Sequence, residues 1–416
     1  MSASINVQKN TCPFNLNLHL PSSKSIANRV MILDALFGTL RNASFYGHAE
    51  DVKNLREALV NCRNKDEVFL GNGGTTLRFA LAYMALKARK PINLIPGNQM
   101  SKRPIKPLLR ALQQLGVEIS QKYNSGKQAL ILHPTINKLY RESIAIDTSR
   151  SSQFASALAL IAPALKNGLT IQFEGDPVSS SYLDMTNKIL NDSGIHAVLE
   201  EREWRISPLT DEYQPLPVIE KDWSAAVFFL CHMCLRPGSE LKVEGLHPTG
   251  LQGDQAILEL LYPFGLECKA HKTGTHFSSR ERHERPDGFL EIDLGKTPDL
   301  APALILTLAL LHQKVKISGL AHLKYKESER LAIISELLND MHVQHTCGDD
   351  CIALHKFPEE WPDRLKVNPR DDHRLAMAGS LLSCQMDLEI RQPDCVKKSF
   401  PNYWKEFAKL RKLENS

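Results

Sequence analysis

The sequence lacks any apolar run long enough to cross a membrane as a helix. Its longest apolar runs, residues 154–165 and 300–311, fall short of the roughly 18 residues that such a helix needs. The first residues also lack a charged leader followed by a long apolar core, so we expect no signal peptide. These absences predict a cytoplasmic protein without a membrane partner.

The sequence also lacks a cysteine pattern typical of disulfide frameworks or zinc sites. Its nine cysteines are scattered and odd in number, which favours reduced thiols. Cys231 and Cys234 form a CxxC motif, but no second pair or histidine cluster completes a metal site. They lie in the apolar run 225–235, and we interpret them as core residues. Cys347 and Cys351 flank an expected hairpin turn, so we expect no bound metal.

A basic tail is missing as well. The formal net charge is +4 and both signs are spread along the chain. No stripe of aromatic residues interleaves with basic ones, which argues against a nucleic-acid partner. Neither a GxGxxG nor a GK[ST] motif is present in the glycine-rich turn. A chain of 416 residues is long for one domain, so two domains are expected.

The segment 21–29, PSSKSIANR, is the first strong feature. The alternating run 14–20 predicts a strand that ends at Leu20, and the serines and helical spacing that follow predict a helix from about Ser23. Lys24 falls in the first turn, where free backbone N–H groups favour an anion. Ser25 and Arg29 are four apart and share one helix face. This indicates a phosphate or carboxylate site, and an ordinary capped helix is the alternative.

Four more helix starts in the first half offer hydroxyls, amides, cations or free N–H groups. The turn 71–78, GNGGTTLR, lets a ligand approach the backbone closely at its glycines. A cation precedes a helix-initiating proline in KRPI, and serines open two further helices. The residues concerned are Asn72, Gly74, Arg103, Ser151, Ser152, Gln153, Ser179 and Tyr182.

The second half carries charged residues before its helices. Asp299 precedes an apolar helix, where it serves as an N-cap or as a general base. Lys326 and Arg330 are four apart on one expected helix face, with Glu327 beside them. A solvated charged face is the alternative interpretation. Arg374 and Lys398 lie at or near two later helix starts.

A coarse pattern recurs along the chain. A leucine-rich helical run ends in Gly, or in His342 in one case, and a short β-prone run follows. The spacing of these junctions suits a repeated unit of several elements. Seven cations also lie at or near helix starts and could hold small polyanions if they meet in one cleft. They are Lys24, Arg29, Arg103, Lys326, Arg330, Arg374 and Lys398.

The ordered motifs resemble one known family. PSSKSxxxR, LGNGGTTLR, KRPI, SSQF, SxxY, PD, KxKESER, DDHR and KSFP occur in the order and at the spacing of the 5-enolpyruvylshikimate-3-phosphate synthases, over about residues 15–406. The resemblance implies an α/β fold of two domains, each built from three βαβαββ repeats, with the active site in the interdomain cleft. The implied domains are 1–20 plus 223–416, and 21–222.

The resemblance also implies an activity and its residues. The enolpyruvyl group of phosphoenolpyruvate passes to the 5-hydroxyl of shikimate 3-phosphate by addition and elimination, in aromatic amino acid biosynthesis, by a monomer without cofactors. Asp299, Glu327 and Lys24 are the implied catalytic groups. Shikimate 3-phosphate would contact Lys24, Ser25, Arg29, Ser151, Ser152, Gln153, Ser179, Tyr182, Asp299, His322 and Lys326. Phosphoenolpyruvate would contact Lys24, Asn72, Gly74, Arg103, Gln153, Arg330, Arg374 and Lys398.

Two departures and two alternatives qualify this resemblance. The family usually has Gly at the position of Ser22 and commonly Asn near that of His322. Enolpyruvyl transfer to UDP-N-acetylglucosamine is one alternative, but that sister family has Lys-Asn where this chain has Lys24-Ser25, and a loop cysteine that is absent here. A non-catalytic polyanion-binding protein of the same fold is the other, and it would not need Asp299 or Glu327.

Overall fold

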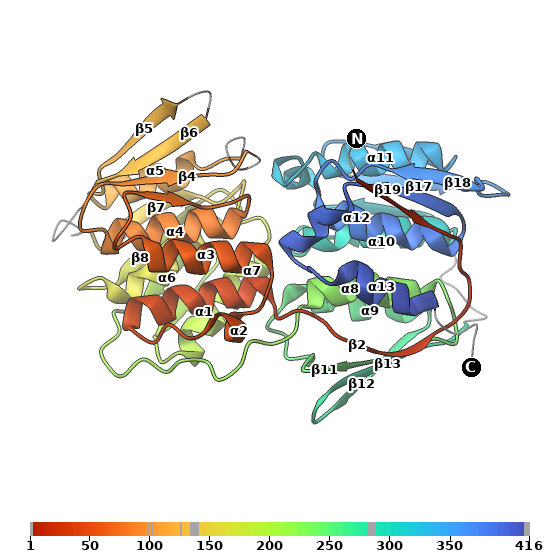
Figure 1. Cartoon of the computed structure of the whole chain (residues 1–416), viewed down its shortest axis with the longest axis horizontal. Helices are drawn as coiled ribbons and strands as arrows, with labels where there is room; N and C mark the ends of the chain where they lie inside the picture. The colour runs from red at the N-terminus through yellow and green to blue at the C-terminus, as the bar shows by residue number, and fades with distance from the viewer. Residues whose placement is uncertain are drawn as a thin grey trace. The chain divides into compact units, whose positions relative to one another are not determined.

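The computed structural model describes residues 3–98, 100, 103–124, 127–133, 141–281 and 288–411. The chain divides into two compact units, coloured along the sequence in Figure 1. Unit 1 comprises Met1–Pro21 and Glu220–Ser416, and unit 2 comprises Ser22–Ile219. The sequence predicts these boundaries after residues 20 and 222. Each unit is described by itself below.

The described part of unit 2 contains two four-stranded sheets and the helices that pack on them. The strands are β3 (Glu67–Phe69), β4 (Ile92–Ile95), β5 (Ile119–Asn124), β6 (Lys127–Leu132), β7 (Ser143–Asp147), β8 (Leu169–Glu174), β9 (Ala197–Leu199) and β10 (Glu203–Ile206). The α-helices are α1 (Lys24–Phe37), α2 (Ala43–Tyr46), α3 (Glu50–Asn61), α4 (Gly74–Lys87), α5 (Lys106–Gln114), α6 (Gln153–Ile161) and α7 (Ser181–Asp192).

The described part of unit 1 contains three sheets. The strands are β1 (Ser4–Val7), β2 (Asn15–Leu18), β11 (Glu240–Glu244), β12 (Leu266–His271), β13 (Gly274–Ser279), β14 (Leu290–Asp293), β15 (Val315–Ser318), β16 (Gln344–Cys347), β17 (Ile352–Lys356), β18 (Arg364–Val367) and β19 (Asp387–Arg391). The α-helices are α8 (Trp223–Cys234), α9 (Ile257–Leu261), α10 (Ala301–Leu310), α11 (Arg330–Asp340), α12 (His373–Gly379) and α13 (Tyr403–Ala408).

Four sheets share one strand order, which reveals the repeat. The orders are β3-β4-β6-β5, β7-β8-β10-β9, β14-β15-β17-β16 and β2-β11-β13-β12. In each, the first two strands are parallel and the remaining two pair antiparallel. A parallel pair needs a helical crossover and an antiparallel pair only a hairpin, so this order is that of a βαβαββ unit.

The other two expected repeats are incomplete. The third sheet of unit 1 has three strands, β1-β19-β18, and the N-terminal strand β1 takes the antiparallel place beside β19. In unit 2 the remaining segment keeps α1 and α3, but it contributes no strand to a sheet among the described residues. The repeat is therefore complete in four sheets of the described residues. β2, the strand before α1, pairs with β11 in unit 1.

Helices form the centre of each unit and sheets form its outer layer. All ten residues of α10 are buried, and α4 is buried from Gly74 to Ala85. These helices pack on other helices, α10 on α8 and α12, and α4 on α3 and α6 (Figure 1). The strands alternate between buried and more exposed residues, as in β8 and β11. Such alternation is expected of sheets that cover a core with one face only.

Two features that the sequence analysis noted lie in these helices. The apolar run 154–165 is α-helical only as far as Ile161, because Pro163 cannot donate the next backbone hydrogen bond and a 3₁₀ turn (Ala162–Ala164) follows. Cys231 and Cys234 are buried in α8, which confirms their core role. Within the described ranges no helix is long and apolar enough to span a bilayer.

Candidate active site

The first helix of unit 2 starts where the sequence predicts, with Ser23 at its N-cap and Lys24 as its first residue. The Lys24 Nζ atom lies 2.9 Å from Oδ2 of Asp51, whose side chain is 3 % exposed. Asp51 stands in the first turn of α3. This partner was not predicted from the sequence, although an acidic residue in the first turn of α3 was a signal for it. The pair orients the lysine ammonium at the start of α1.

The glycine-rich turn 71–78 packs beside Asp51 of α3. A side chain on Gly73 would meet Asp51 Oδ1 at 2.6 Å, so this glycine permits close packing of the turn on α3. A Cβ on Gly74 would lie 3.0 Å each from Arg103 Nη1, Arg78 Nη1 and Gln153 Oε1. Asn72, which is in this turn, packs against Gly97, which follows β4. Gly74 thus keeps open a small space bordered by two guanidinium groups and an amide.

Arg78 ties this turn to the start of α6. It donates to Gln153 Oε1 at 2.5 Å and to the Pro104 carbonyl at 2.8 Å, and its guanidinium lies over the Phe154 ring. Arg78 belongs to the motif GNGGTTLR, but the sequence analysis gave it no role. Lys102, the first residue of the motif KRPI, lies outside the described residues, and Arg103 is within them.

Arg29 is buried inside unit 2. Its side chain donates to Thr186 Oγ1 at 2.6 Å, to the Ser25 carbonyl at 2.9 Å and to the Tyr182 carbonyl at 3.2 Å. Burial lowers its pKa to about 10, and the residue is 1 % exposed. The guanidinium therefore joins α1 to α7 and holds Tyr182 beside the start of that helix.

The predicted serines lie at two helix starts of unit 2. Ser152 is the N-cap residue of α6 and is 3 % exposed, and Ser151 Oγ accepts a hydrogen bond from the Gln153 N–H at 3.3 Å. Ser179 precedes α7 with a φ of 55°, a left-handed conformation that few residues other than glycine adopt. Such outliers occur often at ligand sites.

Arg330 is the centre of the charged cluster in unit 1. Its Nη1 lies 2.9 Å from Asp299 Oδ1, its Nη2 2.7 Å from Glu327 Oε2, and its Nε 2.8 Å from Asp372 Oδ2. The guanidinium is 1 % exposed. Burial alone would lower the pKa of Arg330, but the three carboxylates raise it above its usual value. Arg330 is therefore a fixed positive charge between the two predicted catalytic carboxylates.

Three further cations complete this cluster. Lys398 Nζ lies 2.9 Å from Glu327 Oε1, and Lys326 Nζ lies 3.5 Å from Asp299 Oδ1. Arg374 Nη2 lies 3.1 Å from Asp299 Oδ2. The structure thus brings together Asp299, Glu327, Lys326, Arg330, Arg374 and Lys398, all of which the sequence singled out.

One sequence expectation about this cluster is wrong. Lys326 and Arg330 do not share a helix face, because a 3₁₀ helix (Ala321–Tyr325) ends before Lys326 and α11 begins only at Arg330. Lys326 and Glu327 lie in the loop between them. Ser328 Oγ donates to Asp372 Oδ2 at 3.1 Å, and the Arg330 side chain bonds both Glu327 and Asp372. These bonds favour an open loop over another helical turn.

His322 is 5 % exposed in the 3₁₀ helix before that loop. Burial and the nearby Lys326 charge lower its pKa to about 4, against the opposing effect of Asp299. His322 is therefore neutral at pH 7, and its ring carries one N–H donor and one acceptor nitrogen. A neutral ring at this place resembles an Asn side chain in offering both a donor and an acceptor.

The sequence analysis missed three residues of unit 1 that hold the cluster. Asp372, in the motif DDHR, pairs with Arg330 and caps α12 through the Arg374 N–H at 2.9 Å. Ser224 and Asp254 contact Arg374 from α8 and from the 3₁₀ helix Gly253–Ala256. Asp372 had a signal in its place before a helix, whereas Ser224 and Asp254 stood in no recognised motif.

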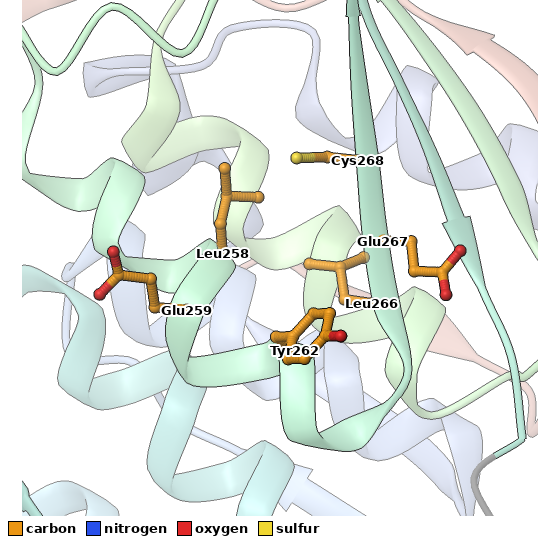
Figure 2. Close-up of a pocket in the computed structure, with 6 residues that line it drawn as sticks. All are labelled: Leu258, Glu259, Tyr262, Leu266, Glu267 and Cys268. Atoms are coloured by element: carbon orange, nitrogen blue, oxygen red, sulfur yellow. The ribbon is translucent and has the colours of Figure 1, made fainter.

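A hollow elsewhere in unit 1 is no part of this cluster. Figure 2 shows it between the end of α9 and β12, with Leu258, Tyr262 and Leu266 around it. Glu259, Glu267 and Cys268 complete the labelled lining. It contains none of the residues predicted from the sequence. Among the described residues, no group of three or more His, Cys, Asp or Glu side chains could hold a metal ion.

Comparison with known protein sequences gives a consistent family. A sequence profile described as EPSP synthase (3-phosphoshikimate 1-carboxyvinyltransferase) matches residues 53–407. A 3-phosphoshikimate 1-carboxyvinyltransferase of Bacteroides fragilis is 30 % identical over 94 % of this chain and 94 % of its own. One of Mannheimia haemolytica is 27 % identical over 94 % of this chain and 96 % of its own.

Comparison with solved structures concerns the fold. An EPSP synthase from Acinetobacter baumannii superposes with a TM-score of 0.73 at 17 % identity, covering 97 % of both chains. The enolpyruvyl transferase NikO from Streptomyces tendae superposes with a TM-score of 0.68 at 13 % identity, covering 99 % of this chain and 98 % of its own. At these identities the likeness establishes the architecture, namely a mixed α/β fold with several small sheets.

Proposed function

Because the chain belongs to the EPSP synthase family, we propose how its residues carry out the reaction of that family. The protein is a transferase that moves the enolpyruvyl group of phosphoenolpyruvate to shikimate 3-phosphate, in the shikimate pathway of aromatic amino acid biosynthesis. The roles of individual residues, given next, are the proposal.

The reaction needs a base, an acid and fixed positive charge. The 5-hydroxyl oxygen of shikimate 3-phosphate bonds to C2 of phosphoenolpyruvate, the hydroxyl proton passes to a base, and the methylene carbon gains a proton. The tetrahedral adduct then expels phosphate, and the methyl group loses a proton to restore the double bond. Each proton transfer calls for a positioned group of suitable pKa. Charge on the departing phosphate calls for preorganised cations.

The observation that carries the assignment is the cluster around Arg330. Two carboxylates, Asp299 and Glu327, contact the same buried guanidinium at 2.9 and 2.7 Å. Asp299 is the proposed base at the hydroxyl, and Glu327 or Lys24 is the proposed acid at the methylene carbon. Arg330, Arg374 and Lys398 hold the charged groups of phosphoenolpyruvate, since each now pairs with a carboxylate that an anionic substrate can replace.

Unit 2 supplies the remaining groups in this proposal. Asn72, Gly74, Arg103 and Gln153 bind phosphoenolpyruvate beside the start of α4. Ser25, Arg29, Ser151, Ser152, Gln153, Ser179 and Tyr182 bind shikimate 3-phosphate together with Lys24, Asp299, His322 and Lys326. The helix starts at these positions support the assignment, because free backbone N–H groups there favour phosphate. Arg29 also orients Tyr182, since one of the hydrogen bonds that its guanidinium donates within unit 2 goes to the Tyr182 carbonyl. The chain acts as a monomer in the cytoplasm, without cofactor.

The test is phosphate release by the purified protein. We expect release only when phosphoenolpyruvate and shikimate 3-phosphate are both present, and its loss on Asp299→Asn. Release with UDP-N-acetylglucosamine in place of shikimate 3-phosphate would reverse the assignment. Binding of both substrates without any release, unchanged in Asp299→Asn, would indicate a polyanion-binding protein instead.

A further inference from the structure

Arg374 is held by side chains from three separate segments of unit 1. Its Nη2 lies 3.1 Å from Asp299 Oδ2 and 3.3 Å from Ser224 Oγ. Its Nη1 lies 3.8 Å from Asp254 Oδ2. Asp299 is the proposed base, whereas Ser224 and Asp254 have no role in the reaction described so far. The guanidinium thus stands between a reacting carboxylate and a second, non-reacting one.

The second carboxylate is firmly placed. Asp254 is 5 % exposed, and its Oδ2 accepts a hydrogen bond from Ser224 Oγ. Gln252, two residues earlier, accepts from the Trp223 N–H at 3.1 Å and donates to the Lys221 carbonyl at 2.7 Å. The 3₁₀ helix that carries Asp254 is therefore fixed on the start of α8, the helix that carries Ser224.

A buried carboxylate is costly unless a cation compensates it. Burial raises the pKa of Asp254 to about 6; the Arg374 charge acts in the opposite direction, while Asp299 and Asp222 raise it further. Arg374 is the cation in contact with it, so the two groups compensate each other in the absence of substrate.

The two carboxylates near Arg374, those of Asp299 and Asp254, must respond differently to catalysis. A substrate anion that binds Arg374 competes with Asp299, and the pairing weakens further when Asp299 takes a proton. The position of the guanidinium then depends on its other contacts, which include the Asp299 backbone carbonyl at 3.3 Å, Ser224 Oγ and the charge of Asp254. We propose that Asp254, acting with Ser224, is a positioning residue that holds Arg374 in place when phosphoenolpyruvate replaces Asp299 as its partner. This inference rests on the proposed function.

The first test separates binding from turnover in Asp254→Asn, which keeps the shape and removes the charge. We expect the KM for phosphoenolpyruvate to rise about tenfold, because the amide no longer attracts the guanidinium 3.8 Å away, with kcat and the KM for shikimate 3-phosphate within about twofold of wild type. Ser224→Ala should give a smaller rise, about threefold. The control is Glu259→Gln, the same exchange at an exposed carboxylate in α9, which should change neither constant.

A second readout uses pH. The groups that face the Asp254 carboxyl are Arg374, Asp299, Asp222 and the Ser224 hydroxyl. With a pKa of about 6 this carboxyl is mostly protonated at pH 5 and mostly ionised at pH 7.5, so the tenfold difference in KM between wild type and Asp254→Asn at pH 7.5 should fall below about threefold at pH 5. The phosphate of the substrate also titrates near pH 6, but it does so equally for both proteins.

The outcomes separate this inference from the proposed function. Absence of wild-type turnover with both substrates overturns the function and the inference together. Wild-type turnover with an unchanged KM for phosphoenolpyruvate in Asp254→Asn overturns the inference alone. If Asp254→Asn lowers kcat and raises both KM values to the same extent, Asp254 has a merely structural role and the inference is overturned. The same holds if the difference in the KM for phosphoenolpyruvate between the two proteins does not depend on pH. If Asp254→Asn does not unfold cooperatively and is therefore misfolded, the kinetic constants of Ser224→Ala decide. An unchanged KM for phosphoenolpyruvate in Ser224→Ala then overturns the inference.

Discussion

Several of the proposed substrate ligands form ion pairs with oppositely charged side chains in the absence of substrate. Lys24 pairs with Asp51 in unit 2, and Lys398 pairs with Glu327 in unit 1. Such pairs keep each cation oriented and partly desolvated, at a net cost or gain that is small in itself. Their value lies in preorganisation, because a substrate anion finds its partners already in place.

Lys24→Ala should lower turnover by roughly 10²–10³ fold, the size of comparable electrostatic deletions in active sites. It removes the ammonium at the start of α1 and leaves Asp51 unpaired. Steady-state kinetics with both substrates measures the effect. The control Lys90→Ala removes a lysine paired with the exposed Asp66 in the same unit and should keep the wild-type rate. A near-normal rate for Lys24→Ala would remove this lysine from the catalytic groups.

His322 makes stability depend on pH, with a sign that follows from its lowered pKa. The folded protein keeps the ring neutral down to about pH 4, whereas the unfolded chain protonates it below about 6.5, so acid favours unfolding within that window. Between pH 7 and pH 5 the wild type should lose about 1–2 kcal/mol that His322→Asn retains. Urea denaturation of both proteins at the two pH values measures this. An equal loss in the two proteins would mean that His322 does not titrate as described.

At the scale of elements, helix ends explain which sequence predictions succeeded. The helix-to-strand junctions at Gly116, Gly194 and Gly265 have φ values of 98°, 81° and 92°. The left-handed conformation is the one that the glycine rule predicts after a helix. The loop of Lys326 and Glu327 was mispredicted as helix, because its shape depends on ion pairs with residues distant in sequence. No local pattern encodes those partners.

His342 occupies such a junction without glycine, with a φ of 60° and an exposed side chain. His342→Gly should stabilise the fold by about 0.5 kcal/mol, because relief of left-handed strain exceeds the greater backbone entropy of glycine in the unfolded chain. Urea denaturation checks it. His312 has a φ of 56°, but its ring stacks on Phe357 with centroids 5.2 Å apart. His312→Gly should therefore destabilise the fold. If His342→Gly and His312→Gly both stabilise the fold, or if neither does, the strain argument is refuted.

For the whole molecule, the sequence predicted the repeated α/β architecture and most of the charged cluster around Arg330. The family motifs carry Asp299, Glu327, Arg330, Arg374 and Lys398, and the structure brings these together. Asp254 and Ser224 could not be predicted, since their importance comes from a contact with Arg374 more than a hundred residues away. Composition and periodicity report local structure, while such contacts depend on the complete fold.

Substrate binding should fix the arrangement of the two units, because the proposed ligands of each substrate come from both. Small-angle X-ray scattering with phosphoenolpyruvate and shikimate 3-phosphate together should therefore differ from that of the free protein. The control is the Lys24→Ala and Arg330→Ala variants mixed with shikimate 3-phosphate. We expect their scattering profiles to change less than that of the wild type. Identical profiles in the free and doubly bound wild type would contradict this expectation.

The pairing of β1 with β19 has a consequence for how the chain is made on the ribosome. Residues 22–219 leave the exit tunnel as one uninterrupted piece and can fold while synthesis continues. The first strand, although it emerges earliest, has to wait for Asp387–Arg391 near the opposite end before it finds its neighbour. β1 therefore stays unpaired until residues 387–391 have been made, whereas β2 can pair with β11 about halfway through synthesis, and unit 2 can fold before unit 1 is complete.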